Sequence, residues 1–480
     1  MNINGGTATT RDLTVAGGDG YNGTVNVNSG LLYIYGDTTG AYFGSDPYNG
    51  TTTGTANINI CGGTLQIEVL NPMGTNALIN ITKGQLLLAG DQVSTVNSYI
   101  SGSQIVAHSG QGSLLVDYDQ TTTGYTTVQA DFLNITTSLS LADEGETVII
   151  PAGTHTLGEY DLDIPLTLES QSGPYQTTIE VEGRGICVSS SGVTIKGFTI
   201  TTSENDTQNL ITVGKSASGT SYAVEDITIE DNILTGMTVT DNSLDYAVIT
   251  LESDQKVSSV KIDKNRITGI SYAGTSSSGV DMCGILVKNG GTDFEDIKIS
   301  NNTLSYITSN DDLVIGIDLH TGVNGYYELR TSLENNTIAC LSGNAGSYGV
   351  IFRETSDNCC LVANSISQTT VGVLIKNGAD DVVLVNNSIY DNVIGIDVKG
   401  SASDTTLLSN GIYNNITYAI RNTSSVTLNA ENNYWGDQYG PYHSSNTQSH
   451  ANPVTDDVDF DYPIQGCDDD IWHINPAEYK

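Results

Sequence analysis

The chain has 480 residues and a formal net charge of −38, from 55 acidic and only 17 basic residues. This excess of negative charge argues against nucleic acid and anionic lipid as partners, because both carry the same sign. No run of eighteen apolar residues occurs, so the sequence predicts no membrane-spanning helix, and the first six residues lack the basic start of a signal peptide.

The first 130 residues repeat a short template in which alternating apolar residues flank a glycine. The copies cover residues 25–34, 58–67 and 79–88, with Gly30, Gly63 and Gly84 in register. Apolar residues at every second position lie on one face of a strand, and glycine between such runs marks a turn. We therefore predict a smaller, irregular β-solenoid or sandwich over residues 1–130, with its junction near residues 118–132.

A second repeat places an Asn, one arbitrary residue and a branched or large apolar residue together eight times. Its copies begin at Asn232, Asn265, Asn302, Asn336, Asn364, Asn387, Asn410 and Asn433, and the last four are 23 residues apart. A fixed period with local insertions is the signature of a solenoid, in which each repeat is one coil. Asn suits a tight corner because it tolerates a left-handed backbone, and stacked Asn side chains can bond between coils.

A third repeat, a glycine followed by four strand residues, runs in step with these asparagines. Its best copies are residues 284–288, 316–320, 349–353, 372–376 and 395–399. Positions one and three after the glycine are apolar, so we predict parallel, in-register strands whose positions one and three point into the coil. Positions two and four are then predicted to point to solvent.

With these repeats, the chain resembles the right-handed parallel β-helix proteins of the pectin-lyase-like superfamily, particularly large secreted and surface proteins. The motifs that carry this resemblance lie at residues 145–154, 166–168, 192–200, 432–436 and 440–441. The resemblance implies a right-handed parallel β-helix over residues 131–436. The superfamily contains lyases, hydrolases, tailspikes, adhesins and proteins without chemistry, so the fold does not define an activity.

Residues 437–480 follow the last coil and are predicted to form a C-terminal cap and an acidic tail. Trp435 occupies the apolar position of the preceding Asn repeats, so we expect it to be buried over the final coil. Tyr434, Tyr439 and Tyr442 lie near Pro441 and are expected to help close the open end, because an uncapped solenoid exposes strand edges. The acidic tail includes Asp456 and residues 468–470.

The fourth position of the glycine repeat collects basic residues, although Lys and Arg are rare in this chain. That column contains Lys288, His320, Arg353, Lys376 and Lys399, and the second position adds Asp318, Asp397 and Arg421. Adjacent rungs lie about 4.8 Å apart, so the column predicts a basic stripe roughly 20 Å long. Such a stripe would suit an acidic polysaccharide; the alternative is that the strand end accepts Lys because its long stem reaches water.

The same residues define a catalytic hypothesis, because a polysaccharide lyase needs a base beside a group that neutralises the uronate carboxylate. His320 or Lys376 would be the base and Arg353 the neutralising group. Asp318 and Asp397 would be acid partners or ligands of calcium, the one cofactor that the sequence suggests. The paired-Asp and Gly-His-Gly signatures of polygalacturonase-type hydrolases are absent, as are the Trp-Ile-Asp-His and Arg-Pro motifs of pectate lyases.

We therefore predict an extracellular or cell-surface β-helix protein with a structural or adhesive role, which contacts polysaccharide or a cell-surface glycan along its long face. One alternative is a lyase or glycoside hydrolase that acts on acidic polysaccharide. Another is a phage tailspike or a fibre subunit, for which homo-oligomers are expected: symmetric trimers for a tailspike and open head-to-tail contacts for a fibre.

Overall fold

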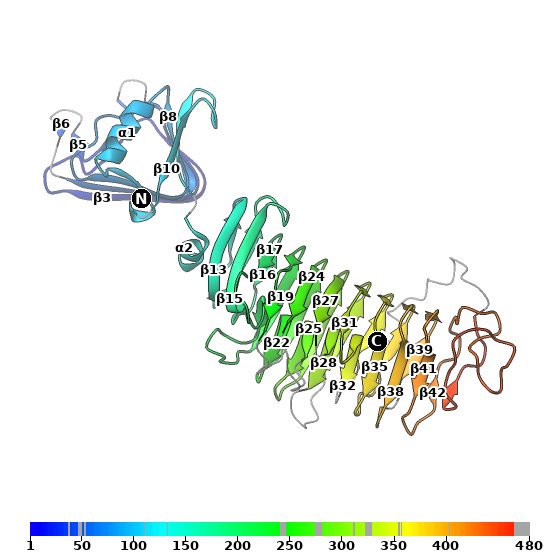
Figure 1. Cartoon of the computed structure of the whole chain (residues 1–480). Helices are drawn as coiled ribbons and strands as arrows, with labels where there is room; N and C mark the ends of the chain where they lie inside the picture. The colour runs from blue at the N-terminus through cyan, green and yellow to red at the C-terminus, as the bar shows by residue number, and fades with distance from the viewer. Residues whose placement is uncertain are drawn as a thin grey trace. The chain divides into compact units, whose positions relative to one another are not determined.

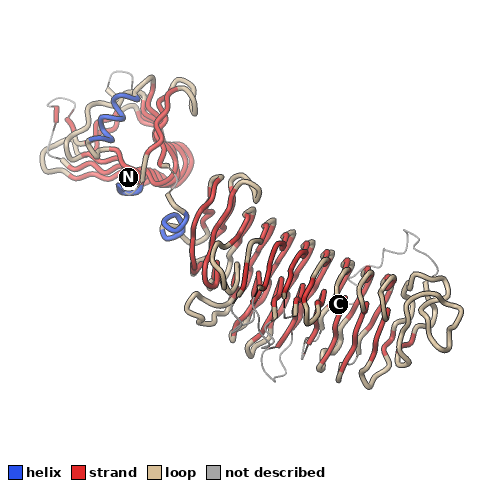
Figure 2. The backbone as a smooth tube through the Cα atoms, in the orientation of Figure 1, coloured by secondary structure: helices blue, strands red, loops and turns tan. Residues whose placement is uncertain are grey.

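The computed structural model describes residues 1–36, 39–46, 50–51, 54–110, 112–131, 133–240, 246–273, 281–310, 313–321, 329–353, 356, 358–402 and 404–464. The chain divides into two compact units, Met1–Asn134 and Ile135–Lys480 (Figure 1). Both are built mainly from β-strands, as Figure 2 shows. Among the described residues, no helix is both long and apolar enough to cross a membrane.

The first unit is a small β-solenoid. Its main sheet contains β1 (Asn2–Thr10), β3 (Asn22–Ile34), β7 (Thr55–Ile67), β8 (Ala77–Ala89), β11 (Tyr125–Ala130) and β10 (Leu114–Tyr118), with β9 (Ile105–Ala107) beside β8. The remaining elements are the strand pairs β2 (Leu13–Val15) with β4 (Ala41–Phe43) and β5 (Ser45–Asp46) with β6 (Gly50–Thr51), the helix α1 (Val93–Ser101) and the 3-10 turn His108–Gly110. Strands β1, β3, β7 and β8 run parallel, and β11 and β10 continue the sheet antiparallel.

The repeated glycines of this unit stack at one corner, as their predicted register requires. A Cβ atom on Gly30 would lie 2.2 Å from the carbonyl oxygen of Gly6, and one on Gly84 would lie 2.0 Å from that of Gly63. Gly30 and Gly84 also have positive φ angles of 78° and 79°. Only glycine allows successive coils to approach this closely in this conformation.

The second unit begins with α2 (Ile135–Ser140) and contains two long sheets. The 12-stranded sheet has the order β12 (Glu146–Ile150), β14 (Leu166–Ser170), β16 (Thr194–Lys196), β19 (Val224–Glu230), β23 (Val257–Asp263), β26 (Phe294–Ser300), β29 (Leu329–Glu334), β33 (Cys360–Val362), β36 (Val383–Val385), β39 (Thr406–Leu408), β42 (Leu428–Asn429) and β43 (Val458–Asp459). Neighbouring strands in this sheet pair in parallel.

The 20-stranded sheet has two limbs, because each coil contributes two stretches of strand to it. We call one the template limb, since it carries the glycine repeat: β18 (Ile211–Val213), β22 (Tyr246–Ser253), β25 (Met282–Asn289), β28 (Val314–Thr321), β32 (Ser347–Arg353), β35 (Val371–Lys376), β38 (Ile394–Lys399) and β41 (Tyr418–Asn422). The other limb contains β17 (Thr199–Thr201), β20 (Ile233–Leu234), β21 (Thr238–Val239), β24 (Arg266–Tyr272), β27 (Thr303–Ser309), β30 (Thr337–Ala339), β31 (Ser342–Gly343), β34 (Ser365–Ser367), β37 (Ser388–Tyr390) and β40 (Gly411–Tyr413). Strands β13 (Gly153–Leu162) and β15 (Thr177–Val188) begin the sheet.

These sheets form a right-handed parallel β-helix, so the predicted fold class is confirmed. In the template limb, Ile285 pairs with Ile317, and the register continues through Val350, Val373 and Ile396 on successive strands. Both Ile317 and Val373 are fully buried. The strands of the glycine repeat therefore stack in parallel and in register, as the sequence predicts.

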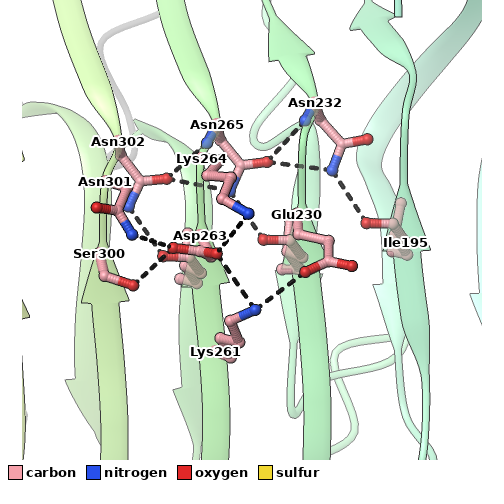
Figure 3. Close-up of polar contacts among 12 residues, drawn as sticks. Ile195, Glu230, Asn232, Lys261, Asp263, Lys264, Asn265, Ser300, Asn301 and Asn302 are labelled. Atoms are coloured by element: carbon pink, nitrogen blue, oxygen red, sulfur yellow. Dashed lines mark hydrogen bonds and ion pairs between the residues drawn. The ribbon is translucent and has the colours of Figure 1, made fainter. Parts of the chain in front are cut away.

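The repeated asparagines form a buried ladder at one corner of the β-helix (Figure 3). The backbone N–H and the Nδ2 of Asn232 both donate to Oδ1 of Asn265, each at 3.1 Å, and Nδ2 also donates to the carbonyl of Ile195 at 3.0 Å. The same bonds recur from rung to rung as far as Asn433. Buried amides are thus hydrogen-bonded in a connected chain, which makes the corner costly to disrupt.

The structure corrects one reason given for Asn at this corner. The left-handed residue is the one before each ladder Asn: Asp231 has φ 55°, Lys264 54° and Asn301 56°. The ladder asparagines are selected for their amide groups, whereas the preceding position selects for tolerance of positive φ. The two requirements fall on adjacent residues, so the sequence pattern alone did not separate them.

The predicted burial of Trp435 at the end of the β-helix is confirmed. Trp435 is 1% exposed, and Pro441 is also buried. The backbone of Tyr434 accepts a hydrogen bond from Ile412, so Trp435 follows the last coil directly. Tyr439 and Tyr442 are about half exposed, at 48% and 45%, so they do not cover the core as expected. Residues 468–470 of the acidic tail lie outside the described residues.

Candidate functional site

The outer face of the template limb brings the predicted basic residues into one column. Lys288 pairs in register with His320, His320 with Arg353, Arg353 with Lys376, and Lys376 with Lys399. The column spans four rung intervals, or roughly 19 Å. All five residues are half-buried. The side chains predicted to form a stripe therefore do lie side by side.

The second strand position, in contrast, does not point to open solvent, so that part of the prediction is wrong. Along this position Leu286 is 7% exposed, Asp318 1%, Ile351 2%, Leu374 4% and Asp397 0%. The reason is that the outer face of the limb carries its own apolar cluster. Its members include Ala247, Cys283, Ile315, Ile351, Val371, Leu374 and Ile394, with Tyr348 and Tyr418 packed against them.

Asp318 is neutralised by Arg353 on the next strand. Arg353 Nε donates to Oδ1 of Asp318 at 2.9 Å, its Nη2 contacts the other carboxylate oxygen, and Nη2 also lies 3.2 Å from Oδ2 of Asp281. Burial is the largest single effect on Arg353 and opposes its charge, but the hydrogen bond to Asp318 and the negative charges of Asp318 and Asp281 together outweigh burial and raise the pKa of the guanidinium above its usual value. Two-point guanidinium–carboxylate pairing is strong, so Asp318 acts as a counter-ion.

Asp397 has a similar environment three rungs away. Arg421 donates to its two carboxylate oxygens, from Nε at 2.9 Å and from Nη2 at 2.6 Å, and Lys399 Nζ lies 2.8 Å from Oδ2. The hydrogen bond to Asp397 raises the pKa of Arg421. Two cations share one carboxylate here, which leaves a net positive charge at this end of the column.

Lys288 and Lys376 differ from the other basic residues of the column. Within the part of the chain that the structure describes, neither lysine is in an ion pair. They lie three rung intervals apart, roughly 14 Å along the face. The stripe is therefore not uniformly basic. Lys288 and Lys376, which are in no ion pair among the described residues, flank Arg353, which contacts two carboxylates.

This arrangement limits the chemistry that the predicted catalytic residues can perform. Asp318 and Asp397 are three rungs apart, roughly 14 Å, whereas the carboxyl pair of a glycoside hydrolase is separated by about 5 to 9.5 Å. Their oxygens are also occupied by guanidinium and ammonium groups, which leaves them poorly placed as calcium ligands. Among the described residues, no group of three or more His, Cys, Asp and Glu side chains could hold a metal ion.

Sequence reasoning missed Asp281 and the apolar cluster. Asp281 precedes its strand and is distant in sequence from Arg353, so no local pattern signalled the contact. The cluster did have a signal. Cys283, Leu286, Ile351, Val371 and Leu374 make these strands apolar at nearly every position, and such continuous runs are typical of strands that are buried on both faces.

Comparison with known proteins concerns the fold alone. Neither a protein-family model nor a characterised protein matches the sequence. Among solved structures, the Azotobacter vinelandii mannuronan C-5 epimerase AlgE4 A-module is 14% identical over 67% of this chain and 91% of that chain, with a TM-score of 0.35. The periplasmic alginate epimerase AlgG is 11% identical over 66% of this chain and 82% of that chain, with a TM-score of 0.30. A GH87 alpha-1,3-glucanase catalytic domain is 10% identical over 70% of this chain and 73% of that chain, with a TM-score of 0.31.

Proposed function

We propose that this protein binds acidic polysaccharide along the outer face of the template limb and serves as a structural or adhesive component outside the cell. The observation that carries the proposal is the pair Lys288 and Lys376. Both stand in one column, and among the described residues neither is in an ion pair. Beyond Lys376, Lys399 and Arg421 both pair with the single carboxylate of Asp397, so this group adds a third positive charge to the row.

A row of separated cations suits a polymer better than a small ligand. A polyuronate presents a carboxylate at each sugar, so several weak contacts at intervals add up along one chain. Exposed ion pairs contribute at most about 1 kcal/mol each, so no single lysine is expected to dominate. The strongly negative remainder of the protein repels anions elsewhere and favours binding at this face.

Binding without turnover is the function that this geometry supports better than catalysis. Arg353 is held between Asp318 and Asp281, so reaching a substrate carboxylate would require breaking a partly buried pair. Neither Asp318 nor Asp397 is arranged to act as an acid, because each accepts hydrogen bonds from cations. A lyase with His320 or Lys376 as its base is the alternative that an assay can decide.

The deciding experiment incubates the protein with polygalacturonate and with alginate, and measures both binding and product. We expect retardation of the protein in gels that contain either polymer, with no absorbance from unsaturated sugars. Unsaturated products that disappear in a His320→Ala or Lys376→Ala variant would identify a lyase instead. Failure to bind any anionic polymer would remove the proposal.

A further inference from the structure

The outer face of the 12-stranded sheet changes character along the β-helix. In its first half, ion pairs connect neighbouring rungs: Lys196 Nζ lies 3.2 Å from Glu169 on the preceding rung. Lys261 Nζ lies 3.0 Å from Glu230 on the preceding rung and 3.2 Å from Asp263 on its own strand (Figure 3). From β26 onward the same face is also hollowed. One cavity of about 890 Å³ covers β26, β29, β33 and β36, and another of about 420 Å³ covers β39 and β42.

These two cavities share Asp381 and have a common floor. The floor is a single register column, one residue per rung: Lys298, Ser332, Cys360, Val383, Thr406 and Asn429. All six line one cavity or the other. Five rung intervals give a groove roughly 24 Å long. Most of its floor is small and uncharged, and it repeats with the spacing of the coils.

A second column borders the floor. Asp296, Asn358, Asp381 and Asp404 each stand two residues before a floor residue. All four adopt the left-handed backbone conformation, with φ of 53°, 57°, 54° and 49°. The groove is thus lined on that border by carboxylate and amide groups on four of its six coils, with Arg330 and Thr427 at the same position on the other two.

The charges of this groove are opposite in balance to those of the template limb. Three corner aspartates and Glu334 line it, against Lys298 and Arg330. Lys298 is itself paired with Glu334, whose other oxygen accepts a hydrogen bond from Ser332 at 2.6 Å. A polyanion would therefore be repelled, whereas carboxylate, amide and hydroxyl groups are good hydrogen-bond partners for sugar hydroxyls.

We propose that this groove is a second polysaccharide site, which binds a neutral, hydroxyl-rich glycan chain. An extended peptide fits less well, because every strand under the groove is already paired on both sides and offers no free edge for β-strand addition. An amphipathic helix would need an apolar floor, and within the floor column only Val383 and the half-buried Cys360 are apolar. This inference extends the proposed adhesive function, because the two sites on different sheets would join two kinds of glycan.

The test uses the whole chain and three soluble neutral probes: dextran, hydroxyethylcellulose and galactomannan. We expect at least one to bind, and Ser332→Trp or Thr406→Trp to weaken that binding by about tenfold or more, since indole would fill the groove. Thr228→Trp is the matched control: Thr228 lies in the same register column, outside the cavities. Thr228→Trp and the pair Lys288→Glu with Lys376→Glu should leave neutral-glycan binding unchanged.

A second readout needs no substitution. Cys360 lies in the groove and is half-buried, whereas Cys61 in the first unit is exposed. A bound neutral glycan should slow maleimide labelling of Cys360 and leave that of Cys61 unchanged. Binding of none of the three probes, equal loss in Thr228→Trp, or unprotected Cys360 at saturating glycan would each overturn the inference. Loss of polyuronate binding alone would refute only the template-limb proposal.

Discussion

Arg353 donates from Nε to Oδ1 of Asp318 at 2.9 Å across 35 residues of sequence, and joins two adjacent rungs on the outside of the β-helix. The carboxylate is 1% exposed, so its charge depends on this guanidinium. Asp318, which looks like a surface acid in the sequence, is thereby part of a second, outer packing layer. The stability of the β-helix should therefore depend on this ion pair.

Replacing Arg353 with Met should destabilise the β-helix by roughly 3 to 5 kcal/mol, because it leaves the buried Asp318 charge without its main partner. The double change Asp318→Leu with Arg353→Met should recover most of that loss, since it removes both charges. Denaturant unfolding of Arg353→Met, of Asp318→Leu and of the double variant measures the coupling free energy between the two residues. If the single and double variants are equally unstable, the pair is not a counter-ion pair.

Acid should weaken the first half of the 12-stranded sheet through Asp263 (Figure 3). Burial alone would raise the pKa of Asp263, but hydrogen bonds from Asn301, Ser300 and Lys261 outweigh burial and lower it. Because its pKa is lowered in the folded state, the carboxylate stabilises the fold at pH values above the ordinary Asp pKa of about 3.9. This stabilisation is lost as the pH falls through the lowered pKa of the folded state.

Asp263→Asn should therefore lower the unfolding midpoint at pH 7 and bring the variant closer to the native protein as the pH approaches 3. Melting curves from pH 7 to pH 3 test this. Asp231→Asn, at a left-handed corner of the same sheet, is a control for the change of charge. If the unfolding midpoints of the variant and the native protein differ by the same amount at every pH, the lowered pKa of Asp263 is contradicted.

Breaking the Asn ladder in its middle should be costly. Asn302→Ala removes an acceptor used by both the backbone N–H and the Nδ2 of Asn265, and a donor to the carbonyl of Ile262. Each buried polar group left unsatisfied costs about 1 to 3 kcal/mol. Hydrogen exchange at the backbone amide of Asn265 should accelerate most. Exchange unchanged there, or equal acceleration in an exposed Thr303→Ala control, would show that the ladder is not a cooperative chain.

Trp435 closes the last coil through its volume. Trp435→Ala should cost about 3 to 5 kcal/mol, as for other buried aromatic residues. Among the described residues Nε1 of Trp435 has no hydrogen-bond partner, so Trp435→Phe removes no bond and should cost clearly less. Thermal unfolding of both variants checks the order. A Phe variant as unstable as the Ala variant would point to a role for the indole N–H.

Polyuronate binding should depend on charge at the template limb. Lys288→Glu with Lys376→Glu should abolish binding, whereas Lys376→Ala should weaken it only modestly, because exposed pairs contribute at most about 1 kcal/mol each. The control pair is Lys256→Glu with Lys264→Glu, which makes the same change of net charge at the two ends of β23 in the 12-stranded sheet.

Binding by the native protein should also fall as salt rises, since the Debye length shortens to about 8 Å at physiological ionic strength. Titrations at low and at physiological salt provide the measurement. If the control pair weakens binding as much as Lys288→Glu with Lys376→Glu does, binding depends on the overall charge of the protein and not on this face.

The sequence was most informative where a physical requirement recurs in every coil. The interval between the asparagines, the buried Trp435 and the in-register apolar positions of the template limb could all be read from spacing, because each coil must present the same corner and core to its neighbours. The column of Lys288 to Lys399 followed from the same register. The sequence could not show which of those basic side chains are held in ion pairs, because counter-ions such as Asp281 come from outside the repeat.

The sequence by itself therefore determined the β-helix, its register and the identity of the residues on each column, since strand alternation and stacking are local rules that repeat. Only the tertiary structure decided the environment of those columns. It buried Asp318 and Asp397 in an outer apolar layer, paired them with Arg353 and Arg421, and hollowed the face above Ser332 and Thr406. Burial and ion pairing are set by what approaches from other coils. The continuous apolar runs of the template strands are a local signal of the outer layer, but no local pattern identifies the ion-pair partners.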